Sequence, residues 1–287
     1  MITLTNHETT AQINPEHGAT VISLTHKGID ILRKTTDTPA IPQNCAMFPM
    51  IPYCSYIADG HFNYFGINRT VPVNQPESKH PIHGDGWLAK WQIEKQTSNS
   101  VSLIYQHKKT SGFPFDYDAK IVYTLQDHSL DVTLTITNPS DMPLPCGMGL
   151  HPYFAHPQEA TIRFNSTHIW YHKNDPIFDR PYPTPAEWNF SDGNTLKEDF
   201  DTAFGGWDGE AKISYQSGLK IHIQAPDIFH HLILYKPTHA DYFCLEPASN
   251  TPNAFNLAAY GVIGTGIQSV GAKQSLTKNI RFDFETP

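Results

Sequence analysis

Leu130-Asp131-Val132-Thr133-Leu134-Thr135-Ile136-Thr137 is the stretch of this 287-residue sequence that decides its fold. Apolar and polar residues alternate at every position, so an extended chain has one apolar face and one polar face here. The same alternation recurs over residues 219–224 and 280–285. Less regular strands are predicted at 20–26, 101–107, 119–125, 230–235 and 242–246, with short turn sequences between them. The sequence therefore predicts a mainly β chain.

Long helices are not expected, because no apolar i, i+3, i+4, i+7 pattern lasts three turns. Parallel strands need crossover helices, so the strands should pair antiparallel. We predict an all-β fold, a large antiparallel β-sandwich with few short helices. The Pro-, Asp- and Asn-rich stretch 174–196 contains several aromatic residues and is expected to be an ordered surface excursion. Because no linker stands out, residues 1–287 are expected to form a single domain.

Composition excludes several classes of partner. The chain has 20 Lys and Arg against 28 Asp and Glu, a net charge of −8, and no cluster of five or more basic residues. Neither nucleic acid nor an anionic membrane surface is therefore an expected partner. The first residues lack the features of a signal peptide and no apolar run is long enough to span a bilayer, which predicts a cytoplasmic protein. The four cysteines form no C-x-x-C pair and are expected to be reduced thiols.

Motifs for dinucleotides, for phosphate loops and for a serine nucleophile are absent from the sequence. Two histidine pairs, 80/83 and 168/172, have metal-like spacing. Zinc sites usually add Cys or carboxylate ligands at matching spacing, and none is evident here. With 16 histidines in the chain, two such pairs are expected by chance. We therefore predict neither a metal nor an organic cofactor.

Three segments carry ionisable residues that an extended or looped chain could present to a ligand. They are 80–87 with His83, 147–154 with His151, and 242–247 with Glu246. Both His151 and Glu246 precede a proline, which favours extended backbone. Alternation places His151 on one face with Gly147 and Gly149, whose small size is expected to leave room for a ligand.

The same alternation places Glu246 on a face with Tyr242 and Cys244, opposite the core-facing Phe243 and Leu245. Simpler interpretations stand beside these. From the pattern alone, His151 can be a histidine hydrogen-bonded at a strand end, and Glu246 a solvated strand terminus. The aromatic residues Trp87, Tyr153 and Phe154 are expected to pack in the core or at its rim.

In this order, the three segments resemble the aldose 1-epimerase (galactose mutarotase) family. The resemblance rests on His83-Gly84, on Leu150 to Phe154, and on Leu245-Glu246-Pro247 with Pro252 and Asn256. Residues 13–32, 50–66 and 200–204 are also similar to family blocks, so the resemblance covers nearly the whole chain. It implies a large β-sandwich with a sugar site on its open face, in agreement with the strand pattern.

The resemblance also implies roles for four residues. Glu246 matches the general base, His151 the general acid, His83 a second active-site histidine, and Asp201 the aspartate that hydrogen-bonds sugar hydroxyls. A carboxylate and an imidazole on opposite sides of the anomeric carbon would open the ring by moving two protons, and the ring would reclose with either face presented. A small sugar is thus the expected partner, no cofactor is implied, and we expect a monomer or a homodimer.

One departure bears on the substrate. Where the family often has Asn-Arg, with the arginine contacting substrate, this chain has Ser55-Tyr56. Tyr56 is therefore expected to contact the sugar, but it donates one hydrogen bond where arginine offers five donors. The sequence does not name the sugar. One alternative is a non-catalytic carbohydrate-binding or sensor protein. The other is a hexose-6-phosphate 1-epimerase, and the missing arginine counts against this second alternative because a phosphate needs cations near it.

Overall fold

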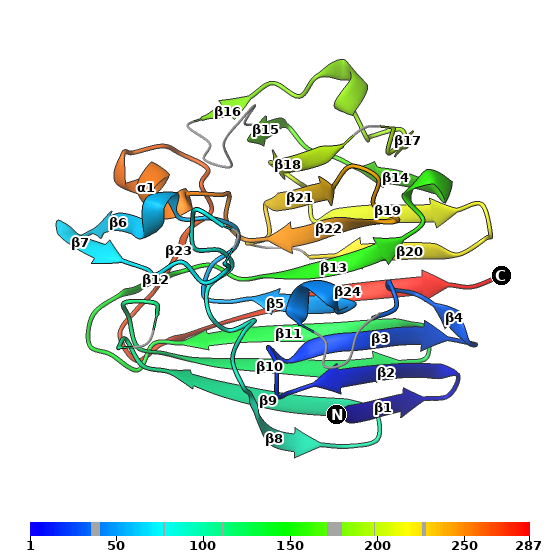
Figure 1. Ribbon diagram of the computed structural model, residues 1–287, viewed down its shortest axis with the longest axis horizontal. Coiled ribbons are helices and arrows are strands. Elements are labelled where there is room, and N and C mark those ends of the chain that lie inside the picture. Colours follow the sequence, from blue (N-terminus) through cyan, green and yellow to red (C-terminus); the bar gives the residue numbers. More distant parts are fainter. Residues whose placement is uncertain (36–40, 77, 111, 171–179, 198, 226–227) are drawn as a thin grey trace.

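The computed structural model describes residues 1–35, 41–76, 78–110, 112–170, 180–197, 199–225 and 228–287. Within these ranges, two large sheets of antiparallel strands make up most of the molecule (Figure 1). In spatial order the first sheet contains β1 (Ile2–Asn6), β2 (Thr9–Asn14), β3 (Thr20–His26), β5 (Met47–Met50), β13 (Gly149–Ala155), β22 (Tyr242–Ala248), β21 (His231–Lys236), β18 (Phe200–Gly205), β15 (His168–Trp170) and β16 (Pro181–Tyr182), with β4 (Ile29–Asp30) beside β3.

The second sheet runs in the order β17 (Asn194–Thr195), β14 (Ala160–Phe164), β19 (Glu210–Tyr215), β20 (Lys220–Gln224), β24 (Ser275–Glu285), β11 (Ser129–Thr137), β10 (Tyr117–Gln126), β9 (Ser100–His107) and β8 (Gln92–Gln96). Two small ribbons pair β12 (Leu144–Cys146) with β23 (Gln268–Val270), and β6 (His61–Tyr64) with β7 (Ile67–Thr70). The helical elements are short: α1 (Ala254–Ala259) and 3₁₀ turns at Pro42–Asn44, Ala58–Gly60, Pro157–Glu159 and Ala186–Trp188. Of the helices described, none is long and apolar enough to cross a bilayer.

The predicted all-β sandwich is confirmed. The alternating stretch 130–137 lies in β11, where Leu130, Val132 and Leu134 are fully buried and the residues between them are partly exposed. The strands predicted at 20–26, 101–107, 119–125, 219–224, 230–235, 242–246 and 280–285 are present as β3, β9, β10, β20, β21, β22 and β24. His172 and the first part of the predicted excursion 174–196 lie outside the described residues. The four cysteines are free and buried.

Apolar side chains cover both faces of the first sheet near its middle. Leu150 and Phe154 of β13 belong to the main core cluster, which draws on both sheets. Their neighbour Tyr153 belongs to a second cluster, together with Phe48 and Trp87. Since neighbours along a strand point to opposite faces, this second cluster lies on the face of the first sheet that is turned away from the main core. That face carries the candidate site.

Candidate active site

Strands β13 and β22 hold His151 and Glu246 side by side. The register pairs Gly149 with Ala248 and Tyr153 with Cys244, which places residue 151 opposite residue 246. Directly opposed residues on antiparallel strands point to the same face, so the imidazole and the carboxyl are neighbours. The predicted faces are thus observed, since Phe243 and Leu245 lie in the main core.

A second row of side chains, one step along the strands, brings in Asp201. Register pairs join Tyr153 to Cys244, Cys244 to Tyr235, and Tyr235 to Asp201 across β13, β22, β21 and β18. Asp201 therefore shares the face of His151 and Glu246 and lies on the third strand from β13. Strands are spaced by about 4.8 Å, so β18 is about 14 Å from β13.

Gly147 and Gly149, which precede His151, allow close packing of the protein's own atoms. A Cβ on Gly149 would lie 2.5 Å from the Pro247 carbonyl oxygen, and a Cβ on Gly147 would lie 1.9 Å from Oδ1 of Asn250. The prediction that their small size leaves room for a ligand is wrong. The space is filled by backbone and side-chain atoms of the segment that follows Glu246, which can approach β13 only because no Cβ intervenes.

His151 and Glu246 form a buried pair. Nε2 of His151 lies 3.2 Å from Oε1 of Glu246, and the two residues are only 6% and 2% exposed. Burial raises the pKa of the Glu246 carboxyl well above its usual value, and the charge of Asp201 raises it further. Burial likewise lowers the pKa of His151 well below its usual value, and His83 and Arg33 add to this through their charge. Both shifts favour uncharged side chains in the free protein.

The imidazole of His151 packs against two aromatic rings, which also contact each other. Phe48 stacks on it with ring centroids 4.4 Å apart and an interplanar angle of 25°. Tyr153 stacks at 4.7 Å and 28°. Nδ1 of His151 is buried with no hydrogen-bond partner in another residue. Ring packing therefore fixes the direction in which Nε2 points, and hydrogen bonding to Nδ1 does not.

His83 reaches the same cavity from an irregular loop. Its backbone φ is +58°, a left-handed conformation that is uncommon outside glycine. Its amide donates to the Ser55 carbonyl at 2.9 Å, while the Ser55 amide donates to Nδ1 of His83 at 3.0 Å. An Nδ1 that accepts a hydrogen bond carries no proton, so the neutral ring has its proton on Nε2. Burial lowers the pKa of His83 to about 3, which keeps the ring neutral.

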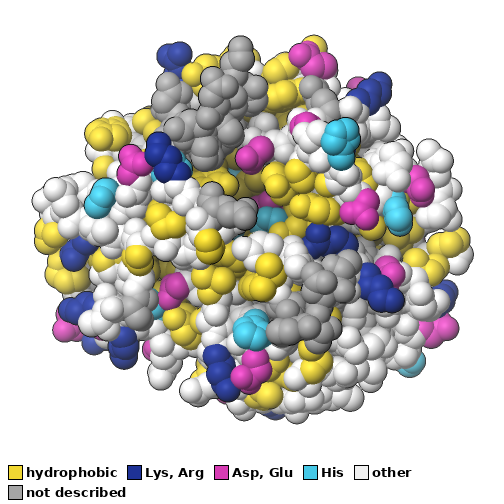
Figure 2. All heavy atoms as spheres, viewed as in Figure 1, with side chains coloured by type: hydrophobic (Ala, Val, Ile, Leu, Met, Phe, Trp, Pro, Cys, Tyr) yellow, Lys and Arg dark blue, Asp and Glu magenta, His cyan; other side chains and the backbone are white. Residues whose placement is uncertain are grey.

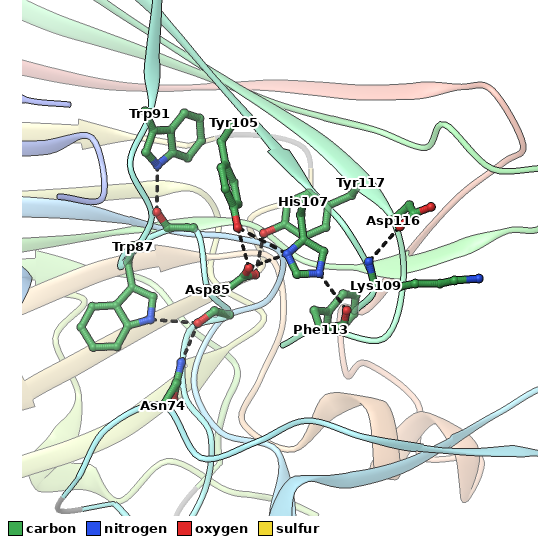
Figure 3. A network of polar contacts seen from close by, with 12 residues as sticks. Asn74, Asp85, Trp87, Trp91, Tyr105, His107, Lys109, Phe113, Asp116 and Tyr117 are labelled. Atoms are coloured by element: carbon green, nitrogen blue, oxygen red, sulfur yellow. Dashed lines mark hydrogen bonds and ion pairs between the residues drawn. The ribbon is translucent and has the colours of Figure 1, made fainter. Parts of the chain in front are cut away.

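Two residues after His83, Asp85 belongs to a polar network that ties the loop to the second sheet (Figure 3). Oδ2 of Asp85 accepts from the Tyr105 hydroxyl at 2.8 Å and lies 2.6 Å from Nδ1 of His107. Oδ1 of Asp85 accepts from the Tyr117 hydroxyl at 2.7 Å. Nε2 of His107 lies 2.8 Å from the Phe113 carbonyl oxygen. Because both partners of the imidazole are acceptors, His107 satisfies them only as a doubly protonated cation.

The adjoining Gly84 is needed where it stands. Its φ is +73°, and a Cβ there would lie 2.2 Å from the Ile51 carbonyl oxygen. The Gly84 carbonyl accepts from the Trp87 indole at 2.9 Å and from the Asn74 amide at 2.7 Å. The loop that carries His83 is therefore fixed on both sides, by Asp85 toward the second sheet and by these donors toward the cavity.

A cavity of about 390 Å³ opens over this face. In the space-filling view, hydrophobic side chains surround the centre of the molecule, with histidine and acidic side chains among them (Figure 2). The cavity is lined by all five residues expected there, His83, His151, Glu246, Asp201 and Tyr56. It also contains residues that the sequence analysis did not single out, among them Arg33, Phe48, Gln75 and Tyr235.

Two other features of the described residues offer space for a ligand or atoms for a metal ion. A groove of about 760 Å³ lies over β19, β20 and β24, but every ionisable side chain that lines it is at least partly exposed. Within the cavity over the first sheet, His151, Cys244 and Glu246 each offer a ligand atom within 4.8 Å of the others. These are the described residues that could hold a metal ion. His80 and His83 instead each accept a backbone hydrogen bond at Nδ1, from Asp59 and Ser55.

Comparison with known proteins matches the chain to a family model and to solved structures of the same fold. A family model described as aldose 1-epimerase matches residues 1–281. The uncharacterized protein YphB of Escherichia coli K12 is 27% identical over 234 residues, which are 74% of this chain and 76% of YphB. A crystal structure of a candidate aldose 1-epimerase from E. coli K12 superposes with a TM-score of 0.90 at 24% identity, covering 99% of this chain and 98% of that one. A galactose mutarotase-like protein from Clostridium acetobutylicum gives 0.86 at 17% identity, covering 99% and 95%.

Proposed function

The chain belongs to the aldose 1-epimerase family, and on that premise we propose that it interconverts the α and β anomers of an aldose by acid–base ring opening. The observation that carries the proposal is the buried contact between His151 and Glu246, 3.2 Å apart at the floor of the cavity. We assign Glu246 as the base and His151 as the acid. The product is the substrate's other anomer, so the enzyme would be an isomerase.

The closeness of the two groups suits this reaction. The anomeric hydroxyl and the ring oxygen are bonded to the same carbon, so adjacent groups on one face of the sheet can act on both. Glu246 takes the hydroxyl proton, the O–H electron pair forms the C1=O bond, and the C1–ring-oxygen bond breaks as His151 gives its proton to that oxygen. Rotation about C1–C2 and the reverse steps give the other anomer. Such groups contribute roughly 10²–10⁴-fold each.

The protonation state of the pair also supports these roles. Burial favours a protonated Glu246 beside a neutral His151. Moving that one proton from the carboxyl to Nε2 gives the carboxylate and imidazolium that the reaction needs, with no proton taken from solvent. His83 remains neutral and offers its Nε2–H as a hydrogen-bond donor to charge that develops on a sugar oxygen.

A sugar panel tests the proposal. Exchange between α and β anomers is measured by NMR, with and without protein, for neutral hexoses, pentoses and hexoses that carry a carboxylate or phosphate. We expect the wild type to accelerate exchange of at least one sugar, and Glu246→Gln to lower that rate by roughly 10²–10⁴-fold. The matched control is Glu187→Gln on an exposed 3₁₀ turn, which should keep the wild-type rate.

A wild-type rate equal to the buffer rate for every sugar would overturn the proposal. If calorimetry then found tight binding of a sugar, the chain would be a carbohydrate-binding protein on this scaffold. Such a result would follow from Ser55 and Tyr56, which line the cavity where the family often has Asn-Arg.

A further inference from the structure

One residue that lines the cavity, Arg33, lies in a segment where no sequence motif was found. It follows β4 and lines the cavity together with Gln43, Asn44, Tyr153 and Tyr242. The Ser55-Tyr56 departure led us to expect a site without an arginine. The structure corrects this expectation, since a guanidinium is present but comes from a different part of the chain.

The Arg33 side chain is held rigidly. Its backbone amide donates to the Tyr153 carbonyl at 2.8 Å, and Nη2 donates to the carbonyl oxygens of Gln43 and Cys45 at 2.7 and 2.9 Å. The guanidinium carbon lies 3.8 Å from the centroid of the Tyr153 ring and 4.5 Å from that of Tyr242. A planar cation stacked on aromatic rings and fixed by two carbonyls is organised in advance for a ligand.

The charge of this guanidinium is not compensated within the described part of the chain. No described carboxylate lies within ion-pair distance of Arg33, although the protein has 28 acidic residues. Nε is buried without a hydrogen-bond partner, and no described residue bonds Nη1. Arg33 is half-buried, and removing part of a charge from water without a counter-charge is unfavourable. A ligand with a negative group would supply the missing partner.

The direction of the sugar follows from the proposed function, on which this inference rests. If the anomeric hydroxyl is at Glu246 on β22 and the ring oxygen at His151 on β13, then C5 and C6, which follow the ring oxygen, extend beyond β13. Arg33 is stacked on Tyr153 of that same strand. Asp201, the carboxylate of the cavity most distant from it, lies on β18, about 14 Å from β13.

We propose that Arg33 binds an anionic substituent, a carboxylate or a phosphate, at the C6 end of the aldose. The site would thus act on hexoses that carry a negative charge remote from C1, with Asp201 left to hydroxyl groups at the other side. Both Nη2 hydrogens are donated to carbonyl oxygens, so Nη1 is the donor left for such a group, through a charge-assisted hydrogen bond. The chemistry shared by both candidates is an oxyanion, and the substrates below separate them.

The test compares glucose, glucuronate and glucose 6-phosphate as substrates in the NMR exchange assay, and as ligands by calorimetry. We expect kcat/KM for one anionic sugar to exceed that for glucose by about 10–100-fold, the effect of a charge-assisted hydrogen bond. Preference for glucuronate identifies a carboxylate subsite, and preference for glucose 6-phosphate a phosphate subsite. Arg33→Met should remove the preference through KM, and the same loss should appear in the binding constant.

Two variants control for structure. Arg163→Met makes the same change on the exposed side of β14, where the guanidinium bonds Ser191, and should keep the wild-type preference. Arg33→Lys keeps the charge and should restore part of the preference. If Arg33→Met does not fold, the salt dependence of the wild type replaces it, since screening should reduce the preference for the charged sugar.

The outcomes separate this inference from the proposed function. Acceleration of glucose with no preference for either anionic sugar would overturn the role of Arg33 and leave the epimerase standing. A preference that Arg33→Met leaves intact would also overturn it. If no sugar is accelerated, the epimerase proposal fails, and the calorimetric comparison of charged and neutral sugars still decides whether Arg33 binds an anion.

Discussion

Two of the histidine–carboxylate pairs in the described part of the chain differ in charge: His151–Glu246 is held neutral, and His107–Asp85 is held charged. His151 and Glu246 are 3.2 Å apart on the cavity face of the first sheet, and His107 and Asp85 are 2.6 Å apart between the loop of His83 and the second sheet. Burial lowers the pKa of His151. Burial also acts to lower the pKa of His107, but hydrogen bonds to Asp85 and Phe113 and the Asp85 charge outweigh it and raise that pKa.

The difference comes from the number of hydrogen-bond partners. Asp85 accepts from two tyrosine hydroxyls besides His107, and such donors stabilise the charged form of a carboxylate. Glu246 has one polar partner among the described residues, His151. A fully bonded pair holds its protons in place and fixes structure. A pair that lacks partners keeps a transferable proton, which suits catalysis.

The largest expected effect is a loss of anomer-exchange rate when the His151–Glu246 pair is changed. His151→Asn should lower kcat for anomer exchange by roughly 10²–10⁴-fold, because the variant has no group that can protonate the ring oxygen. The ring stack with Phe48 and Tyr153 would lose one member, so the fold should persist, which circular dichroism checks. A variant that keeps more than a tenth of the wild-type rate would contradict the role of His151.

The same kind of change in the structural pair should act on stability. Asp85→Asn places an amide donor against His107 and removes the counter-charge, so we expect the free energy of unfolding to fall by about 3 kcal/mol. Urea unfolding measures it, with Asp30→Asn on exposed β4 as the matched control. An unchanged midpoint would show that the network does not stabilise the loop of His83.

A third test uses the sign of the pH dependence. His107 has a raised pKa, so its stabilisation is fully present below about pH 6.5, the unfolded-state value, and is lost as pH rises through the folded-state pKa. His151 has a lowered pKa, so stability is lost there as pH falls below about 6.5. The free energy of unfolding is measured against pH for the wild type, His107→Asn and His151→Asn. The difference between the wild type and each variant should change with pH in opposite directions for the two variants. Slopes of equal sign would abolish the contrast between the pairs.

The smallest effect is expected in the pH–rate profile. The pair keeps one proton between the lowered pKa of His151 and the raised pKa of Glu246. We therefore expect kcat to stay nearly constant across and beyond the ordinary Glu and His values, about pH 4.3 and 6.5. Rates corrected for buffer catalysis measure this. A narrow bell between the two ordinary values would show that the two groups titrate independently.

Much of the cavity face of the first sheet was predictable, because alternation in strands is a local property. The sequence pattern placed His151 and Glu246 on the right faces of their strands and singled out His83, and the family resemblance added Asp201. The partners of Asp85 were not predicted, although His107 gave a signal. It follows Val101 and Leu103 at two-residue spacing on the buried face of a predicted strand, and a buried histidine there needs a hydrogen-bond partner.

Arg33 shows where sequence reasoning stopped. Its approach to Tyr153 and Tyr242 depends on where the segment after β4 crosses the first sheet, and no local pattern records that. The glycines at 147 and 149 show a second limit. Alternation gave their face correctly, but only the packed chain revealed that the atoms filling the space belong to the protein itself.

Side chains reach the cavity from two kinds of backbone, paired strands and irregular segments. Side chains that we assign to the chemistry stand on paired strands, in rows across the first sheet, whereas Arg33, Tyr56 and Gln75 reach it from segments outside the large sheets. Insertions and exchanges are tolerated far better in such segments than in a central strand. We therefore expect that the loop segments can be exchanged one at a time to change which sugar is recognised. The residues on the paired strands would stay as they are.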